Sequence, residues 1–210
     1  MPILRLAGKA SIRCRPVNSA LGITLNAMPT VIAFLRAINV AGRFIRMADL
    51  ASHFQVLGLA DVSTYINSGN VLFRTKARNL EKLGLQIEND LEPLLGFRSE
   101  VFLRTPADLH RIAAAATSYR SCVPASGEVN VAFLVAPLTK EQLASLYELR
   151  TDLDEFAHSE REVYWLCKGN QMKSKFSNAV MERRLKLRCT FRRVSMLSKL
   201  SKQLRSSGDA

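Results

Sequence analysis

The sequence predicts an α+β protein made of two tandem ferredoxin-like halves, each with the order βαββαβ, followed by extra C-terminal helices. Two observations lead to this prediction. Short β-rich runs alternate with amphipathic helical patterns in that order from residue 30 to residue 104. The same order begins again at residue 129, just under 100 residues further on, as after a duplication.

The first half begins with a continuous apolar run at residues 31–35, which is typical of a strand buried on both faces. Apolar residues at helical spacing from Met47 to Leu57 predict a helix, and Gly58 is placed to end it. The next expected elements are a hairpin, a helix and a fourth strand, at residues 62–66 with 70–74, about 79–95, and 100–104. Pro93 falls in the last turn of that helix and is expected to kink it or end it early.

The hairpin allows two turns. A turn at Gly69-Asn70 would be a tight II′ turn, whereas a turn at Ser68-Gly69 implies a longer or bulged loop. In both cases polar side chains lie at the tip, where two strands end.

The middle of the chain holds a third helix and a linker. The start of the helix is marked by Thr105 as N-cap, Pro106 at the first helical position and Asp108 at the third. Residues 117–128 combine Ser, Pro and Gly with little periodicity, which is typical of a linker. The expected units are a first half at 29–118, a linker at 119–128 and a second half at 129–205 with a basic C-terminal segment.

The second half repeats the order of elements. The expected elements are a strand at 129–135, a helix capped by Thr139, a hairpin with Arg161-Glu162 near its turn, a helix opened by Ser174, a last strand at 190–192 and a closing helix at 194–204. Each half alone is small for a core, so we expect the two halves to share an interface.

Residues 1–28 carry four basic residues and no acidic one. Such a stretch can mimic a transit peptide, but the apolar core of a secretory signal is missing. The simpler explanation is that translation begins at Met28 and that the preceding stretch is a start-site artefact. We expect this extension to be poorly ordered.

The net charge of +12 is unevenly distributed along the chain. Residues 29–167 hold 14 Lys and Arg against 16 Asp and Glu, a net charge of −2. Residues 168–205 hold 12 Lys and Arg against Glu182 alone, a net charge of +11. A neutral body with a basic C-terminal segment indicates an anionic partner, and the alternative is a solvated face that only aids solubility.

Composition excludes several classes of protein. A hydrophobic fraction of 48% allows a real core, and no apolar run approaches the roughly 20 residues needed to span a bilayer, so we expect no membrane partner. The four cysteines show no CxxC spacing and indicate reduced thiols of a cytoplasmic protein. The three histidines are not clustered, so we expect neither a metal site nor a cofactor.

Polar residues that end the first strand and the hairpin form one group of candidates. Arg36 could hold a phosphate or carboxylate through two hydrogen bonds, with Asn39 beside it. Asn67, Ser68 and Asn70 offer uncharged donors and acceptors that suit an amide, a sugar or a base edge. The alternatives are a local ion pair for Arg36 and ordinary turn chemistry for the rest.

A second group lies in the basic segment. Lys173, Ser174, Lys175 and Asn178 surround an expected helix N-terminus, where free N–H groups and lysines favour an anion. The alternative is a capped surface helix, and the match to a phosphate-binding P-loop fails. Arg192 completes the set of expected ligand-binding residues. Motifs of hydrolases, zinc proteases and dinucleotide-binding proteins are absent, so no catalytic residue is assigned.

Several linked segments resemble a known family. Residues 34–42 (FLRAINVAG) and 47–50 (MADL) resemble the opening LLRGINVGG…MAEL signature of the bacterial domain-of-unknown-function 1697 family. The resemblance continues in residues 64–71, 161–166 and 174–183, and covers about residues 29–200. It implies two ferredoxin-like halves and no activity, because the family is uncharacterised. Ala37 and Ala41 stand where the family has glycine.

We therefore expect a non-catalytic binding module for an anionic ligand, a nucleotide or a nucleic acid. This expectation depends on the basic segment and on the fold, since ferredoxin-like sheets commonly present a face to RNA. The alternative is an enzyme that acts on a small phosphorylated or carboxylated metabolite in a cleft between the halves, with Arg36, Lys175 and Arg192 holding the anion. A third hypothesis is an interaction protein that docks on an acidic partner.

Overall fold

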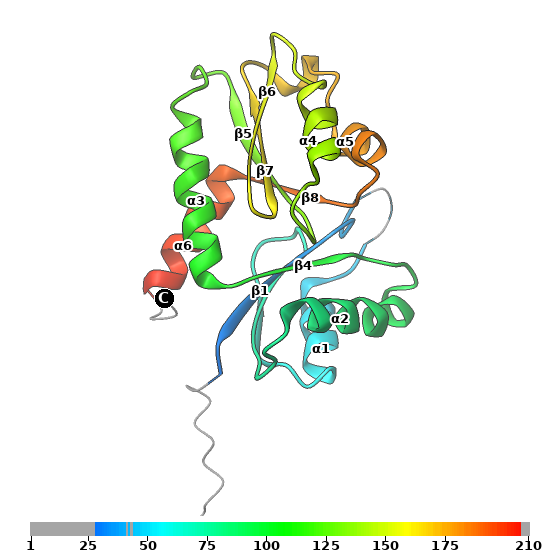
Figure 1. Ribbon diagram of the computed structural model, residues 1–210. Helices are drawn as coiled ribbons and strands as arrows, with labels where there is room; N and C mark the ends of the chain where they lie inside the picture. The colour runs from blue at the N-terminus through cyan, green and yellow to red at the C-terminus, as the bar shows by residue number, and fades with distance from the viewer. Residues whose placement is uncertain (1–27, 41, 43, 207–210) are drawn as a thin grey trace, which may run out of the picture.

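The computed structural model describes residues 28–40, 42 and 44–206, so the expected extension lies outside the described residues except for Met28. Two four-stranded antiparallel sheets form the body of the protein, with helices on the outside and between them (Figure 1). The predicted α+β class with two βαββαβ halves and C-terminal helices is confirmed.

The first half follows the predicted order. Its elements are β1 (Thr30–Leu35), α1 (Met47–Val56), β2 (Ala60–Thr64), β3 (Asn70–Arg74), α2 (Leu80–Leu95) and β4 (Val101–Arg104). The strands lie in the order β2-β3-β1-β4. A third helix, α3 (Pro106–Arg120), then leads to the second half.

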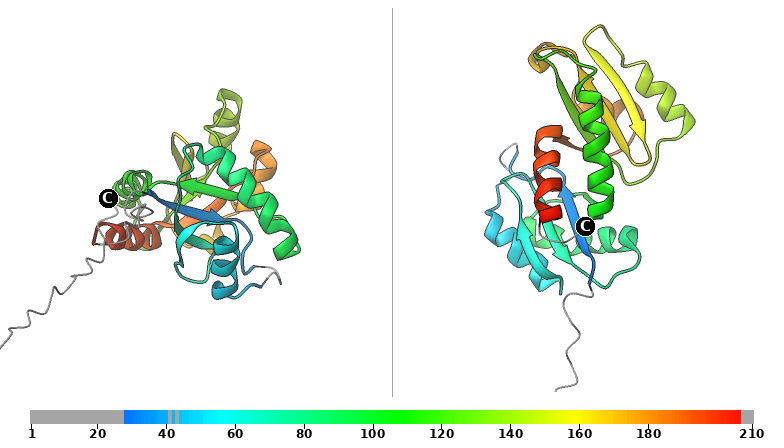
Figure 2. Two further views of the ribbon diagram at one scale, coloured as in Figure 1. Left: turned by 90° about the horizontal axis from the view of Figure 1, so that it is seen from below. Right: turned by 90° about the vertical axis from the view of Figure 1, so that its left-hand side faces the viewer.

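The second half has the same topology. Its elements are β5 (Glu128–Phe133), α4 (Lys140–Tyr147), β6 (Asp154–Ser159), β7 (Glu162–Cys167), a short 3₁₀ helix η2 (Gln171–Lys173), α5 (Asn178–Leu185), β8 (Thr190–Arg193) and α6 (Val194–Ser206). The strands lie in the order β6-β7-β5-β8. Helices α3 and α6 follow the fourth strand of their halves and lie side by side (Figure 2).

Strand register defines which positions correspond between the halves. Phe34 on β1 faces Asn70 and Phe102, and Phe133 on β5 faces Glu162 and Thr190. Ile32 faces Arg104 in the first sheet as Val131 faces Arg192 in the second. The corresponding pairs used below are Phe34 with Phe133, Asn70 with Glu162, Glu100 with Arg188, and Arg104 with Arg192.

The two halves share a central core, as expected. Phe34 and Phe133 stack with ring centroids 4.2 Å apart. Around them pack residues from both sheets and from α3 and α6, including Ile32, Leu109 and Leu197. Two further cores lie under α1 and α2 and under α4 and α5. Ile32 and Phe34 face the shared core while Val31 and Ala33 face the core of their own half, so β1 buries apolar side chains on both faces.

The caps explain where several helices begin. Thr105 with Asp108, and Thr139 with Gln142, form the reciprocal hydrogen bonds of a capping box. Two helices end later than expected. Helix α2 does not end at Pro93 but continues to Leu95, and Gly96 at φ 72° forms its C-cap. Helix α3 reaches Arg120 and so extends into the predicted linker.

The structure corrects one local prediction and decides between two alternatives for another. Ser174 does not open a helix, because Asn170 caps the 3₁₀ helix and Ser177 caps α5. The hairpin has the longer loop of the two alternatives, since the Tyr65 N–H bonds to the Asn70 carbonyl at 2.9 Å and four residues lie between them. Its Gly69 has φ 66°, a conformation that favours glycine.

Candidate functional site

Arg192 lies in the protein interior and links the two halves. Its Nε donates to Asn70 Oδ1 at 2.6 Å, and its Nη2 donates to the carbonyls of Leu35 at 2.9 Å and Ser68 at 2.8 Å. Its Nη1 bonds within β8 to Thr190 Oγ1 and to the Phe191 carbonyl. Burial without a carboxylate partner lowers the pKa of Arg192 to about 10. All of its N–H groups are therefore used inside the protein.

Arg104 of the first half likewise extends into the second half and binds groups there. Its Nε donates to Glu162 Oε1 at 2.6 Å, and its Nη2 donates to the carbonyls of Leu134 at 2.9 Å and Arg161 at 3.0 Å. Burial is the largest cause of the lowered pKa of Arg104, and it outweighs the attraction of Glu162. The two arginines thus cross between the halves at corresponding positions, and each binds the carbonyl of the corresponding leucine, Leu134 or Leu35.

Arg36 is bound by acidic residues from both halves. Its Nε and Nη2 donate to the two oxygens of Glu182 at 2.7 Å and 2.8 Å, and its Nη1 lies 3.3 Å from Glu100. The bond to Glu182 is the main reason that the pKa of Arg36 is raised. Of the two interpretations of Arg36, an ion pair is what the structure contains.

The other predicted residues of the first half support the loops around Arg36. Asn39 has φ 57°, accepts a hydrogen bond from the Ile45 N–H at 2.9 Å and approaches the Asn67 carbonyl at 3.4 Å. Asn70 is fully buried and donates to Ser68 Oγ and to the Tyr65 carbonyl. Only Asn67 of these has an exposed side chain. Ala37 has φ 59°, a conformation that favours glycine.

The predicted residues around α5 do not converge on one point. Ser174 donates to the carboxylate of buried Asp154 at 2.8 Å, which anchors the loop before α5. Asn178 accepts from the thiol of Cys189. Lys173 and Lys175 are exposed on opposite sides of Ser174 in sequence. The structure therefore brings Arg36, Asn70 and Arg192 into the contact region between the halves and leaves the two lysines at the surface.

A further feature of chemical interest is a cleft that none of the ten predicted residues lines. Its volume is about 610 Å³, and it lies between α2 with β4 of the first half and the loops after β5, β6 and α5 of the second. The lining residues include Leu85, Phe102, Val135 and Leu187, which give it apolar walls. Leu85 and Val135 are about half exposed, at 51% and 48%. We call this space the inter-half cleft.

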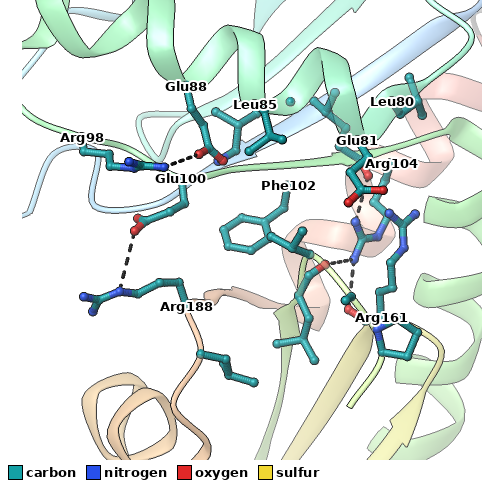
Figure 3. A pocket seen from close by; sticks show the side chains of 18 of the residues that line it. Leu80, Glu81, Leu85, Glu88, Arg98, Glu100, Phe102, Arg104, Arg161 and Arg188 are labelled. Atoms are coloured by element: carbon teal, nitrogen blue, oxygen red, sulfur yellow. Dashed lines mark hydrogen bonds and ion pairs between the residues drawn. The ribbon is translucent and has the colours of Figure 1, made fainter. Parts of the chain in front are cut away.

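Four arginines line the inter-half cleft (Figure 3). Arg98 and Arg188 lie on one side of Phe102, and Arg104 and Arg161 lie on the other. Arg98 approaches buried Glu88 at 3.5 Å, and Arg188 lies 3.8 Å from Glu100. Both of these pairs are long, and both arginines are more than half exposed.

Arg161 differs from the other three because it has no ion pair with any residue in the described part of the chain. It is only partly exposed, and its positive charge contributes to the lowered pKa of the neighbouring Arg104. A guanidinium group beside another one, at the edge of an apolar space, favours an anion in that space. The inter-half cleft therefore combines apolar walls and exposed Glu81 with a guanidinium group that has no ion pair among the described residues.

Little in the sequence pointed to these arginines. Arg161 stands at the predicted hairpin turn and Arg188 within the basic segment. The sequence gives both positions but does not indicate that the two side chains line the same space. Arg98 follows the end of α2 with no distinguishing pattern. The three come from separate loops, and their proximity depends on how the halves pack.

The lining of the cleft contains no serine, threonine, cysteine, histidine or lysine among the described residues. It thus lacks the usual nucleophiles and a histidine base. Within residues 28–40, 42 and 44–206 no cluster of three acidic, histidine or cysteine side chains could hold a metal ion. Over the same residues, no helix has the length and apolar character required to cross a bilayer.

Comparisons with known proteins agree with the fold. A family model described as "Protein of unknown function (DUF1697)" matches residues 28–164. The solved structure of the conserved bacterial protein SP0830 from Streptococcus pneumoniae is similar, with a TM-score of 0.60 at 21% identity over 85% of this chain and 99% of that chain. At this identity the similarity shows the fold alone. No curated protein matches the chain.

Proposed function

The chain belongs to the DUF1697 family, and we propose that it is a binding protein for a small organic anion that enters the inter-half cleft. The observation that carries the proposal is Arg161, a partly buried guanidinium group without an ion pair among the described residues. The apolar side chains of Leu85 and Val135 would contact the body of the ligand. Clefts of several hundred Å³ with a few converging polar groups are the usual form of small-ligand sites.

Binding is favoured over catalysis by the residues that line the cleft. Its ionisable groups are arginines and glutamates, and Glu88 already accepts a hydrogen bond from the Val101 N–H at 2.8 Å. Arginine is always protonated near neutral pH and holds an anion rather than transferring a proton to it.

A small ligand is also favoured over a nucleic acid on the sheet face. The sheet faces opposite the α1–α2 and α4–α5 layers pack into the shared core with α3 and α6. The faces that RNA-binding sheets use are therefore covered here. Within the basic segment, α5 and α6 lie apart from one another (Figure 1).

We propose that this function is performed in the cytoplasm. Cys122, Cys167 and Cys189 are free thiols, which a reducing compartment preserves.

Calorimetric titration with alkanoates of increasing chain length, probes that combine one carboxylate with an apolar body, tests the proposal. We expect affinity to rise with chain length, because each buried methylene group contributes roughly 0.8 kcal/mol. Arg161→Gln should weaken binding about tenfold, the usual loss for one charge-assisted hydrogen bond. The control is Arg46→Gln, which removes an exposed arginine that pairs with Asp49 away from the cleft.

Equal affinity of the wild type and Arg161→Gln for every probe would overturn the assignment of Arg161. The absence of binding by any alkanoate to the wild type would overturn the proposed function.

A further inference from the structure

A second hollow adjoins the inter-half cleft. Its volume is about 770 Å³, and its charged lining consists of Arg36, Arg183, Lys186, Arg188 and Glu182. We call it the basic hollow. Leu187 and Arg188 line both spaces, so the two spaces adjoin at this short segment.

The basic hollow is the counterpart of the cleft in the duplicated fold. Glu182 accepts the N–H of Cys189 at 2.9 Å, just as Glu88 accepts the N–H of Val101 at 2.8 Å. Val135, an apolar wall of the cleft, corresponds to Arg36 in the hollow, since each lies two positions after the corresponding phenylalanine, Phe133 or Phe34. The same architecture therefore produces an apolar space on one side and a basic one on the other.

The single acidic residue of the basic hollow is fully engaged. Glu182 is 7% exposed, and Arg36 binds both of its oxygens. The Cys189 N–H shares Oε1, and Arg188 lies 3.6 Å from Oε2. Glu182 consequently neutralises about one positive charge and has little capacity left for the others.

The remaining cations are free to bind a ligand. Arg183 and Lys186 are exposed and have no ion pair with any residue that the structure describes. Together with Arg188, which is 62% exposed, they present three cationic groups toward one space.

We propose that the basic hollow binds a phosphate group of the ligand whose body occupies the cleft. A phosphate, with more charge and more acceptor oxygens than a carboxylate, matches a mixed set of arginine and lysine donors. Arg161 lies at the far side of Phe102 from Arg188 (Figure 3). The ligand class is therefore an organic phosphate that carries a second anionic group at the other end of an apolar body. This inference rests on the proposed function of the cleft.

The experiment compares ω-phosphonoalkanoates with alkanoates of the same chain length by calorimetric titration. At the chain length that spans both spaces, the added phosphonate should increase affinity about tenfold or more. The double variant Arg183→Gln/Lys186→Gln should remove this gain while leaving alkanoate affinity unchanged. The control Arg184→Gln/Lys199→Gln removes the same charge from exposed residues outside the hollow and should keep the gain.

The outcomes separate the two proposals. If alkanoates bind through Arg161 but the phosphonate adds no affinity at any chain length, the hollow is not a phosphate site and the cleft proposal stands. If the gain persists in Arg183→Gln/Lys186→Gln, or is lost equally in the control, the hollow is likewise refuted. If neither probe binds, both proposals fail.

Discussion

Arg104 and Arg192 occupy corresponding positions on β4 and β8, and each extends into the opposite half. The Nη2 of each donates to the carbonyl at the end of the other half's first strand, Leu134 at 2.9 Å and Leu35 at 2.9 Å. Each guanidinium also lies near the aromatic ring of that strand, 5.3 Å from the Phe133 centroid and 5.7 Å from the Phe34 centroid. The duplicated halves are thus held together by a reciprocal pair of buried arginines, and the cleft lies beside this junction.

The first prediction concerns Arg192. Arg192→Met would leave the Asn70 amide oxygen and the carbonyls of Leu35 and Ser68 buried without their donor. Each buried unsatisfied group costs about 1–3 kcal/mol, so we expect a loss of at least about 3 kcal/mol in the free energy of unfolding. Urea denaturation measures it. Arg193→Met, at a side chain that is 69% exposed, is the control and should change stability by under about 1 kcal/mol.

The second prediction concerns Arg104 and its charged partner. Arg104→Met leaves Glu162, whose side chain is fully buried, with only Arg111 at 3.4 Å, and should cost about 3–5 kcal/mol. Adding Glu162→Gln removes the buried charge and should restore part of the stability. Denaturation of the single and double variants gives the coupling energy. Additive losses in the double variant would show that the two side chains do not act as a pair.

The third prediction separates strain from crowding at the hairpin loop. A Cβ at Gly69 would lie 2.9 Å from Ile38 Cβ and 3.2 Å from Leu35 Cβ, whereas a Cβ at Gly58 would meet no atom within 4 Å. Both glycines have positive φ, 66° and 77°. Gly58→Ala should therefore cost about 1 kcal/mol from backbone strain alone, and Gly69→Ala about 1–3 kcal/mol more. Equal losses in thermal unfolding would contradict the crowding at Gly69.

The fourth prediction concerns alkaline pH. Burial, with a smaller effect of Glu182, raises the pKa of the Cys189 thiol above its ordinary value of 9.0. The folded protein keeps this proton above pH 9 while the unfolded chain releases it, so the free energy of unfolding falls as pH rises through that range. The slope reaches about 1.4 kcal/mol per pH unit for one proton. In the Cys189→Ala variant, the free energy of unfolding should fall less steeply with pH, by that amount per pH unit. Denaturation at several pH values measures the two slopes. An unchanged slope would contradict the prediction.

Local sequence signals were sufficient to predict most of the helices and strands. The capping boxes at Thr105 and Thr139 and the apolar run of β1 each act within a few residues. An early end of α2 at Pro93 and a helix opened by Ser174 were wrong for a physical reason. The C-cap at Gly96 and the packing of α2 outweigh a proline near its end, and Ser174 Oγ is bound to Asp154 from a distant strand end.

The candidate site was much less accessible from the sequence. Arg36 and Arg192 were recognised as arginines at strand ends, but both are engaged by protein groups from the other half. Arg98, Arg161 and Arg188 line the inter-half cleft from three loops that are far apart in the chain.

The sequence by itself determined the order of elements, the duplication and the excess of positive charge, because periodicity, caps and composition are properties of short segments. Only the tertiary structure decided which arginines are hydrogen-bonded or ion-paired inside the protein and which face a cleft or the solvent. That distinction depends on the distance between groups up to 157 positions apart, such as Leu35 and Arg192. No local pattern encodes such a distance, since it arises when the two halves pack around a shared core.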